Sequence, residues 1–170
     1  MRSKKSQKVA GFAVVVTLAL MLSYLEAKLP SFVAIPGIKL GITNAVVLTV
    51  LYLYGTKKAY AVNFLRIALV SLLFGSAVGF IYSAAGGLLS TTAMVIMKRF
   101  KRFNIVTVSV TGGIMHNIGQ IIAAMILMNT SSVGWYLAVL WFSGLLSGAL
   151  IGILTGILCK RLKNVSGNIL

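Results

Sequence analysis

The chain of 170 residues consists mostly of long apolar runs that are almost free of charge. A helix that crosses a bilayer needs about 20 mostly apolar residues, because its backbone polar groups must be satisfied inside the lipid. The sequence therefore predicts an all-α integral membrane protein with six transmembrane helices in a single transmembrane domain over 1–170. The helices are expected at about 9–28, 40–54, 58–74, 77–97, 105–128 and 133–159.

The first run follows a basic amino terminus, as the apolar part of a signal peptide does. A cleavable signal needs small residues just after its apolar part, whereas this run leads into Tyr24, Leu25 and Glu26. We therefore expect a retained helix.

The charges predict the orientation of the helices. Lys and Arg account for 16 of the charged residues, and Glu26 is the only acid. Most basic residues fall at the two termini and in the connections after the second and fourth runs: Arg2, Lys4, Lys5, Lys8, Lys57, Lys58, Lys98, Arg99, Lys101, Arg102, Lys160, Arg161 and Lys163. The opposite side has Lys28 and Lys39. Because cytoplasmic loops are enriched in Lys and Arg, both termini are expected to be cytoplasmic.

Several classes of function do not fit this composition. The basic residues lie between apolar runs, so their expected partners are anionic membrane lipids and not nucleic acid. Cys159 is the only cysteine, which excludes a disulfide framework. One His, one Cys and one carboxylate do not form a closed metal site, and there is no phosphate-binding loop. We expect no catalytic constellation, no metal and no cofactor, and therefore not an enzyme.

Two patterns predict close contacts or binding within the membrane. The last run has glycines at four-residue spacing: Gly144, Gly148, Gly152 and Gly156. Such a stripe packs closely against a second helix, either of the same chain or of another subunit. In the fifth run Gly112, His116 and Gln120 share one helix face, with Asn117 beside it. These side chains predict a small polar ligand site or a proton relay, or alternatively an interhelical hydrogen bond.

Arg66 lies near the middle of the third run, one turn after Asn63. It has three options: to pair with Glu26, to extend toward the inner surface, or to meet an anionic ligand. Both prolines lie between Glu26 and Asn44, where they predict either an ordered outer loop or a binding site beside interrupted helices. The candidate ligand-binding residues are Asn44, Asn63, Arg66, His116, Asn117, Gln120, Glu26 and Lys39.

Two motifs suggest a family. The segment 35–41, Ile-Pro-Gly-Ile-Lys-Leu-Gly, is followed by Thr43-Asn44, and a second motif reads Gly113-x-x-His116-Asn117-x-Gly119-Gln120. Together they resemble the Gx transporter family, also named heptaprenyl diphosphate synthase component I. The resemblance implies a six-helix bundle like the S components of energy-coupling factor transporters, in the bacterial cytoplasmic membrane.

The resemblance implies two functions. The first is binding and transport of a small organic solute from the outer face, similar to a vitamin, a flavin or a quinone precursor, with a separate energy-coupling module as partner. The alternative is a non-catalytic subunit of isoprenoid-quinone metabolism or extracellular electron transfer that binds a quinone or anchors a redox partner. A third, weaker reading is a proton-coupled carrier that depends on His116. Prenyl chain elongation needs Asp-rich motifs that hold Mg²⁺, and the chain has no Asp, so it is not expected to be the catalytic subunit.

Overall fold

The structure is a computed structural model that describes residues 4–28, 43–74, 76–100 and 102–166. These residues form six α-helices and one short 3-10 helix. The α-helices are α1 (Lys4–Lys28), α2 (Asn44–Leu53), α3 (Thr56–Phe74), α4 (Ala77–Arg99), α5 (Ile105–Met128) and α6 (Tyr136–Ser166). The 3-10 helix η1 (Ser132–Trp135) precedes α6. The prediction of six helices is confirmed.

Local chemistry explains where several helices begin and end. Ser76 caps α4 by accepting a hydrogen bond from the backbone N–H of Gly79 at 3.0 Å, and Asn104 caps α5 in the same way through Thr107 at 2.8 Å. Asn129 adopts a left-handed conformation, with φ of 46°, that ends α5. Gly55, with φ of 90°, provides the sharp turn between α2 and α3 that a residue with a Cβ rarely adopts.

Four helical segments are long and apolar enough to cross a membrane: Val9–Glu26, Ala77–Arg99, Ile105–Met128 and Ser132–Arg161. Helix α2 has only 10 residues, about 15 Å of helix, which is half the thickness of a hydrocarbon core. Helix α3 has 19 residues but includes Lys57, Lys58 and Arg66, which lower its hydropathy. The six helices are therefore four full-length apolar helices, one short apolar helix, as its predicted range of about 40–54 already indicated, and one more polar helix.

The short helix α2 lies at the centre of the bundle. It contacts each of the other five α-helices, whereas α1 contacts only α2 and α3. Val47, Leu48, Val50 and Leu51 of α2 are completely buried. At the carboxyl end of α2, Lys98 Nζ donates a 2.6 Å hydrogen bond to the carbonyl of Leu51, where a cation favourably meets the helix dipole. The last turn of the long helix α4 thus holds the carboxyl end of the short central helix.

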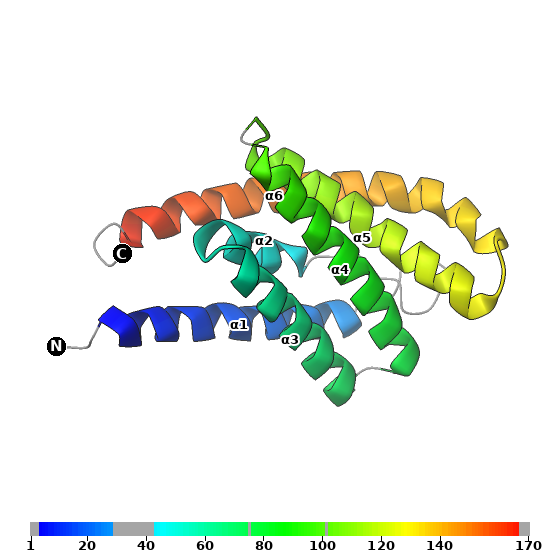
Figure 1. The fold of residues 1–170 in the computed structure, drawn as a ribbon, viewed down its shortest axis with the longest axis horizontal. Coiled ribbons are helices and arrows are strands. Elements are labelled where there is room, and N and C mark those ends of the chain that lie inside the picture. Colours follow the sequence, from blue (N-terminus) through cyan, green and yellow to red (C-terminus); the bar gives the residue numbers. More distant parts are fainter. Residues whose placement is uncertain (1–3, 29–42, 75, 101, 167–170) are drawn as a thin grey trace.

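The remaining helices form a layered arrangement around α2. Helix α5 packs between α4 and α6, and α3 packs against α4 (Figure 1). The start of α1, the end of α6 and the α2–α3 turn lie at one end of the molecule, and the α5–α6 connection lies at the opposite end (Figure 1). The end of α4 and the start of α5 meet at the top of this view (Figure 1).

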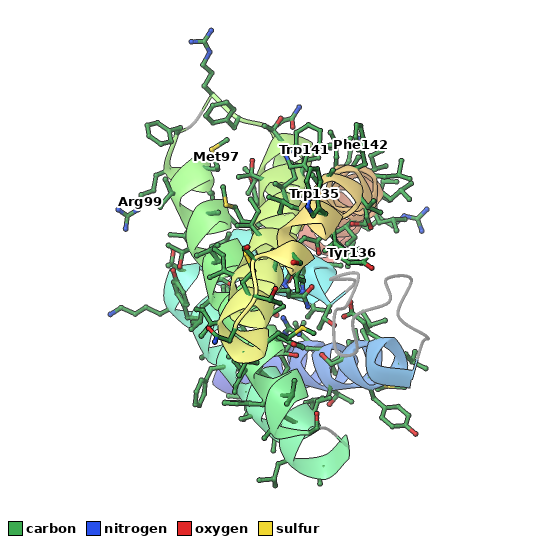
Figure 2. All side chains as sticks on the ribbon, turned by 90° about the vertical axis from the view of Figure 1, so that its right-hand side faces the viewer. Met97, Arg99, Trp135, Tyr136, Trp141 and Phe142 are labelled. Atoms are coloured by element: carbon green, nitrogen blue, oxygen red, sulfur yellow. The ribbon has the colours of Figure 1, made fainter. Side chains whose placement is uncertain are left out.

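The surface of the bundle is largely apolar. Large exposed side chains occur on every long helix, among them Leu72 at 83% and Ile126 at 74%. Aromatic side chains gather around the start of α6, where Trp135, Tyr136, Trp141 and Phe142 lie close together (Figure 2). Trp135 is 87% exposed, as expected for a side chain at a membrane–water boundary. Polar side chains, by contrast, collect inside the bundle.

Candidate ligand-binding site

The interface of α3 and α4 fixes the position of Arg66. Asn63 donates from Nδ2 to the hydroxyl of Thr91 at 3.0 Å and accepts at Oδ1 from Arg66 Nε, also at 3.0 Å. The absence of a side chain at Gly87 makes room for this amide, since a Cβ there would lie 3.1 Å from Asn63 Nδ2. Arg66 is 6% exposed, and its Nη2 has no hydrogen-bond partner among the described residues.

A second polar group joins α1 to the start of α2. Oε2 of Glu26 accepts hydrogen bonds from the hydroxyl of Thr43 at 2.6 Å and from its backbone N–H at 3.3 Å. Ser23 donates to the same hydroxyl at 3.2 Å. The Glu26 carboxylate also interacts electrostatically with His116 and Arg66. This attraction favours pairing with Glu26 among the three options for Arg66, which stay predictions.

The interface of α4 and α5 places His116 and Gln120 beside Gly86. A Cβ at Gly86 would lie 2.8 Å from the backbone oxygen of His116 and 2.9 Å from Gln120 Cγ. Likewise, a Cβ at Gly119 would lie 2.7 Å from the backbone oxygen of Ala85. The glycines therefore let the two helices approach closely enough to bury both polar side chains, which are at most 3% exposed.

Asn117 faces a different helix from its neighbour His116. Its Nδ2 donates to the carbonyl of Leu140 in α6 at 2.6 Å, while its Oδ1 has no partner within the described part of the chain. Asn117 therefore joins α5 to α6, whereas His116 and Gln120 face α4.

These contacts bring most of the predicted site residues to one depth. Asn63 lies against Gly87, and Gly86 lies against His116 and Gln120, so α3, α4 and α5 meet at the same level. Glu26 reaches this level through its interactions with Arg66 and His116. We call Glu26, Asn63, Arg66, His116 and Gln120 the buried polar layer.

The other two candidates differ in position. Asn44 follows Thr43, is 4% exposed, and neither its Oδ1 nor its Nδ2 has a partner in the segments that the structure describes. Lys39 and both prolines lie outside the described residues, so the outer loop or binding site predicted there stays a prediction.

The glycine stripe of α6 packs against α5 of the same chain. A Cβ at Gly144 would lie 2.9 Å from the backbone oxygen of Gly113, and one at Gly148 would lie 2.7 Å from Val110 Cα. Gly152 approaches Val106, and Gly156 approaches Ile105, in the same way. The stripe therefore positions Asn117 against α6 and is separate from the buried polar layer.

One comparison with known proteins gave a match. The family model described as heptaprenyl diphosphate synthase component I matches residues 15–158. The chain belongs to this family. The resemblance read from the two sequence motifs is thereby confirmed. No curated protein and no solved structure matches the chain.

In this member of the component I family, the matched segment includes the whole buried polar layer.

The predicted site residues did not include the hydroxyl groups around that layer, namely Ser23, Thr43, Ser83, Ser90 and Thr91, of which Thr43 appeared only in a family motif. A signal for three of them was present, because Ser83, Gly86, Gly87, Ser90 and Thr91 follow helical spacing along one face of α4. Within the described residues, no three His, Cys, Asp or Glu side chains gather as a metal site would require.

Proposed function

We propose that this component I family member is an S-component-like membrane protein that binds a small organic solute at the buried polar layer and the unpartnered polar side chains beside it, and takes the solute up from the outer face. The observation that carries the proposal is a set of buried polar atoms without hydrogen-bond partners among the described residues. They are both amide atoms of Asn44, Arg66 Nη2, Asn117 Oδ1 and the hydroxyls of Ser83 and Ser90. Each such group costs about 1–3 kcal/mol when it is left unsatisfied, so a ligand that completes these bonds stabilises the fold.

The distribution of polarity supports a membrane location. The exterior exposes large apolar side chains, while charged and amide groups are buried. A protein in water hides its apolar residues, and a helical bundle in lipid tolerates intramembrane ionisable groups only toward its interior. The proposed topology has six spans, with α2 shielded by its neighbours, and both termini in the bacterial cytoplasm.

Cysteine labelling tests this topology. Cys159 is replaced by Ser, and one cysteine is introduced at an exposed position, either Thr56→Cys at the start of α3 or Ser131→Cys in the α5–α6 connection. A membrane-impermeant maleimide is expected to label Ser131→Cys in intact cells, and Thr56→Cys only after lysis. Equal labelling of both positions in intact cells would contradict the orientation.

Native mass spectrometry of the protein purified from its own membrane tests solute binding. The wild type is expected to retain a small molecule, and Asn44→Ala is expected to lose it. Thr155→Ala is the matched control, because Thr155 is also buried with an unpartnered hydroxyl but lies on α6 near the inner end of α5. A wild-type protein that carries only lipid, and that no vitamin, flavin or quinone precursor stabilises, would contradict the proposal. A ligand at 100 times its Kd stabilises by about 2.7 kcal/mol, which is easily measured.

The family description favours a second candidate, a non-catalytic subunit beside an isoprenoid-quinone pathway enzyme. Catalysis by this chain itself is not proposed, because the chain has no Asp to hold Mg²⁺ against a diphosphate. Energy for uptake would come from a separate coupling module. A retained quinone, instead of a water-soluble molecule, would favour the second candidate.

A further inference from the structure

The guanidinium of Arg66 is fixed in position by a relay of polar contacts. Thr91 of α4 holds the amide of Asn63, and that amide in turn accepts from Arg66 Nε. Asn63 is 1% exposed and Arg66 is 6% exposed, so both groups are held away from the surface. The relay uses one side of the guanidinium and leaves Nη2 without a hydrogen bond from the described residues.

Few side chains in the chain can accept a hydrogen bond from Arg66 Nη2 as an anion would. Glu26 is the only acidic side chain, and its Oε2 already accepts two hydrogen bonds from Thr43. The Glu26 carboxylate interacts electrostatically with His116 as well as with Arg66. A buried guanidinium binds best to an oxyanion, whose two oxygens match its planar donors.

A second donor lies at the same depth. Both Asn63 and Ile67 contact the position of Gly87, so Arg66 lies opposite this part of α4. Ser83 is one turn from Gly87 in the outward direction, is 6% exposed, and has an unpartnered hydroxyl. A hydroxyl and a guanidinium at one level form a donor pair for an anion.

We propose that the solute carries an oxyanion, a carboxylate or a phosphate, that Arg66 Nη2 binds with the Ser83 hydroxyl as a second donor. The inference rests on the proposed function and adds the charge of the solute. The oxyanion belongs to a soluble molecule, because Arg66 faces the bundle interior while its neighbours Phe64 and Leu65 expose apolar side chains to the outside.

Thermal unfolding in detergent with simple probes tests the inference. Sodium acetate and sodium phosphate are compared with sodium chloride at equal ionic strength, and acetamide plus sodium chloride is the neutral counterpart of acetate. Acetate or phosphate is expected to raise the unfolding temperature of the wild type by at least about 2 °C relative to both controls. Arg66→Gln is expected to lose this rise. Arg99→Gln, which removes an exposed arginine at the end of α4, is expected to keep it.

The inference would be overturned if acetate and phosphate did not raise the unfolding temperature of the wild type, or if they raised that of Arg66→Gln equally. It would also be overturned if the stabilisation depended on Arg66 only in micelles that contain phosphatidylglycerol, because the anion would then be a lipid headgroup. If Arg66→Gln does not fold, Arg66→Lys is used in its place. Lysine keeps the charge but lacks the planar donors, so a reduced rise supports the inference and an undiminished rise overturns it. A neutral solute found by native mass spectrometry would overturn the inference while leaving the proposed function intact.

Discussion

Gly113→Ala is expected to prevent stable packing of α5 against α6. A Cβ at position 113 would lie 2.5 Å from the backbone oxygen of Gly144 and 3.4 Å from Gly148 Cα. Both obstacles are backbone atoms of a helix, so no side chain can rotate away and the helices must separate. Overpacking typically costs about 1–3 kcal/mol, and we expect a loss at the upper end of this range or beyond it. Separation also breaks the hydrogen bond from Asn117 to the carbonyl of Leu140.

Thermal and denaturant unfolding in detergent measure this loss, with Gly134→Ala as the matched control. The nearest atom to a Cβ at Gly134 is Met125 Sδ at 3.9 Å, so the same added methyl group meets an ordinary contact. We expect the control to change the free energy of unfolding by less than about 0.5 kcal/mol. Equal effects of the two substitutions would show that α5 and α6 are not in backbone contact.

The second large effect is expected for Glu26→Gln, which removes the only acid in the chain. The substitution leaves the buried guanidinium of Arg66 without its nearby negative charge and weakens the acceptor for Thr43. Leaving a buried charge uncompensated and weakening a buried hydrogen-bond acceptor are both destabilising, and we expect a loss of at least about 1–3 kcal/mol.

A double-mutant cycle isolates the charge interaction from the other contacts. Glu26→Gln, Arg66→Gln and the combined variant are compared by unfolding in the absence of added anions. The double variant is expected to lose less stability than the two single losses together, by about 1–3 kcal/mol, because no buried charge remains uncompensated. Strict additivity would indicate that the two side chains do not interact.

The existence of the helices could be predicted from sequence because it depends on local apolar composition. The ends of the helices were predicted less accurately, because hydropathy marks where the apolar residues stop and not where a helix stops. Helix α1 begins at Lys4, several residues before the expected start near 9, and α6 continues to Ser166 past the expected end near 159. In both cases the additional helix carries the basic residues outside the apolar run.

The polar contacts were predictable to the extent that they were local. Asn63 and Arg66 are one helical turn apart, so their hydrogen bond follows from spacing. The bond between Glu26 and Thr43 joins side chains 17 positions apart in the sequence, and its formation depends on how α1 packs against the start of α2. Sequence also grouped Asn117 with His116, whereas neighbouring helix residues point in different directions and contact different helices.

The length of α2 in the sequence did not predict that this helix lies at the centre of the bundle. Its central position and short length together have a mechanical consequence. A helix of 10 residues is too short to bend appreciably, so its two ends move together. Its first turn adjoins Thr43 and the amide of Asn44, and its last turn is tied through Leu51 to Lys98. Any displacement at the start of α2 is thereby transferred to the basic end of α4, which gives the Glu26–Thr43 contact a rigid link to Lys98 through the middle of the protein.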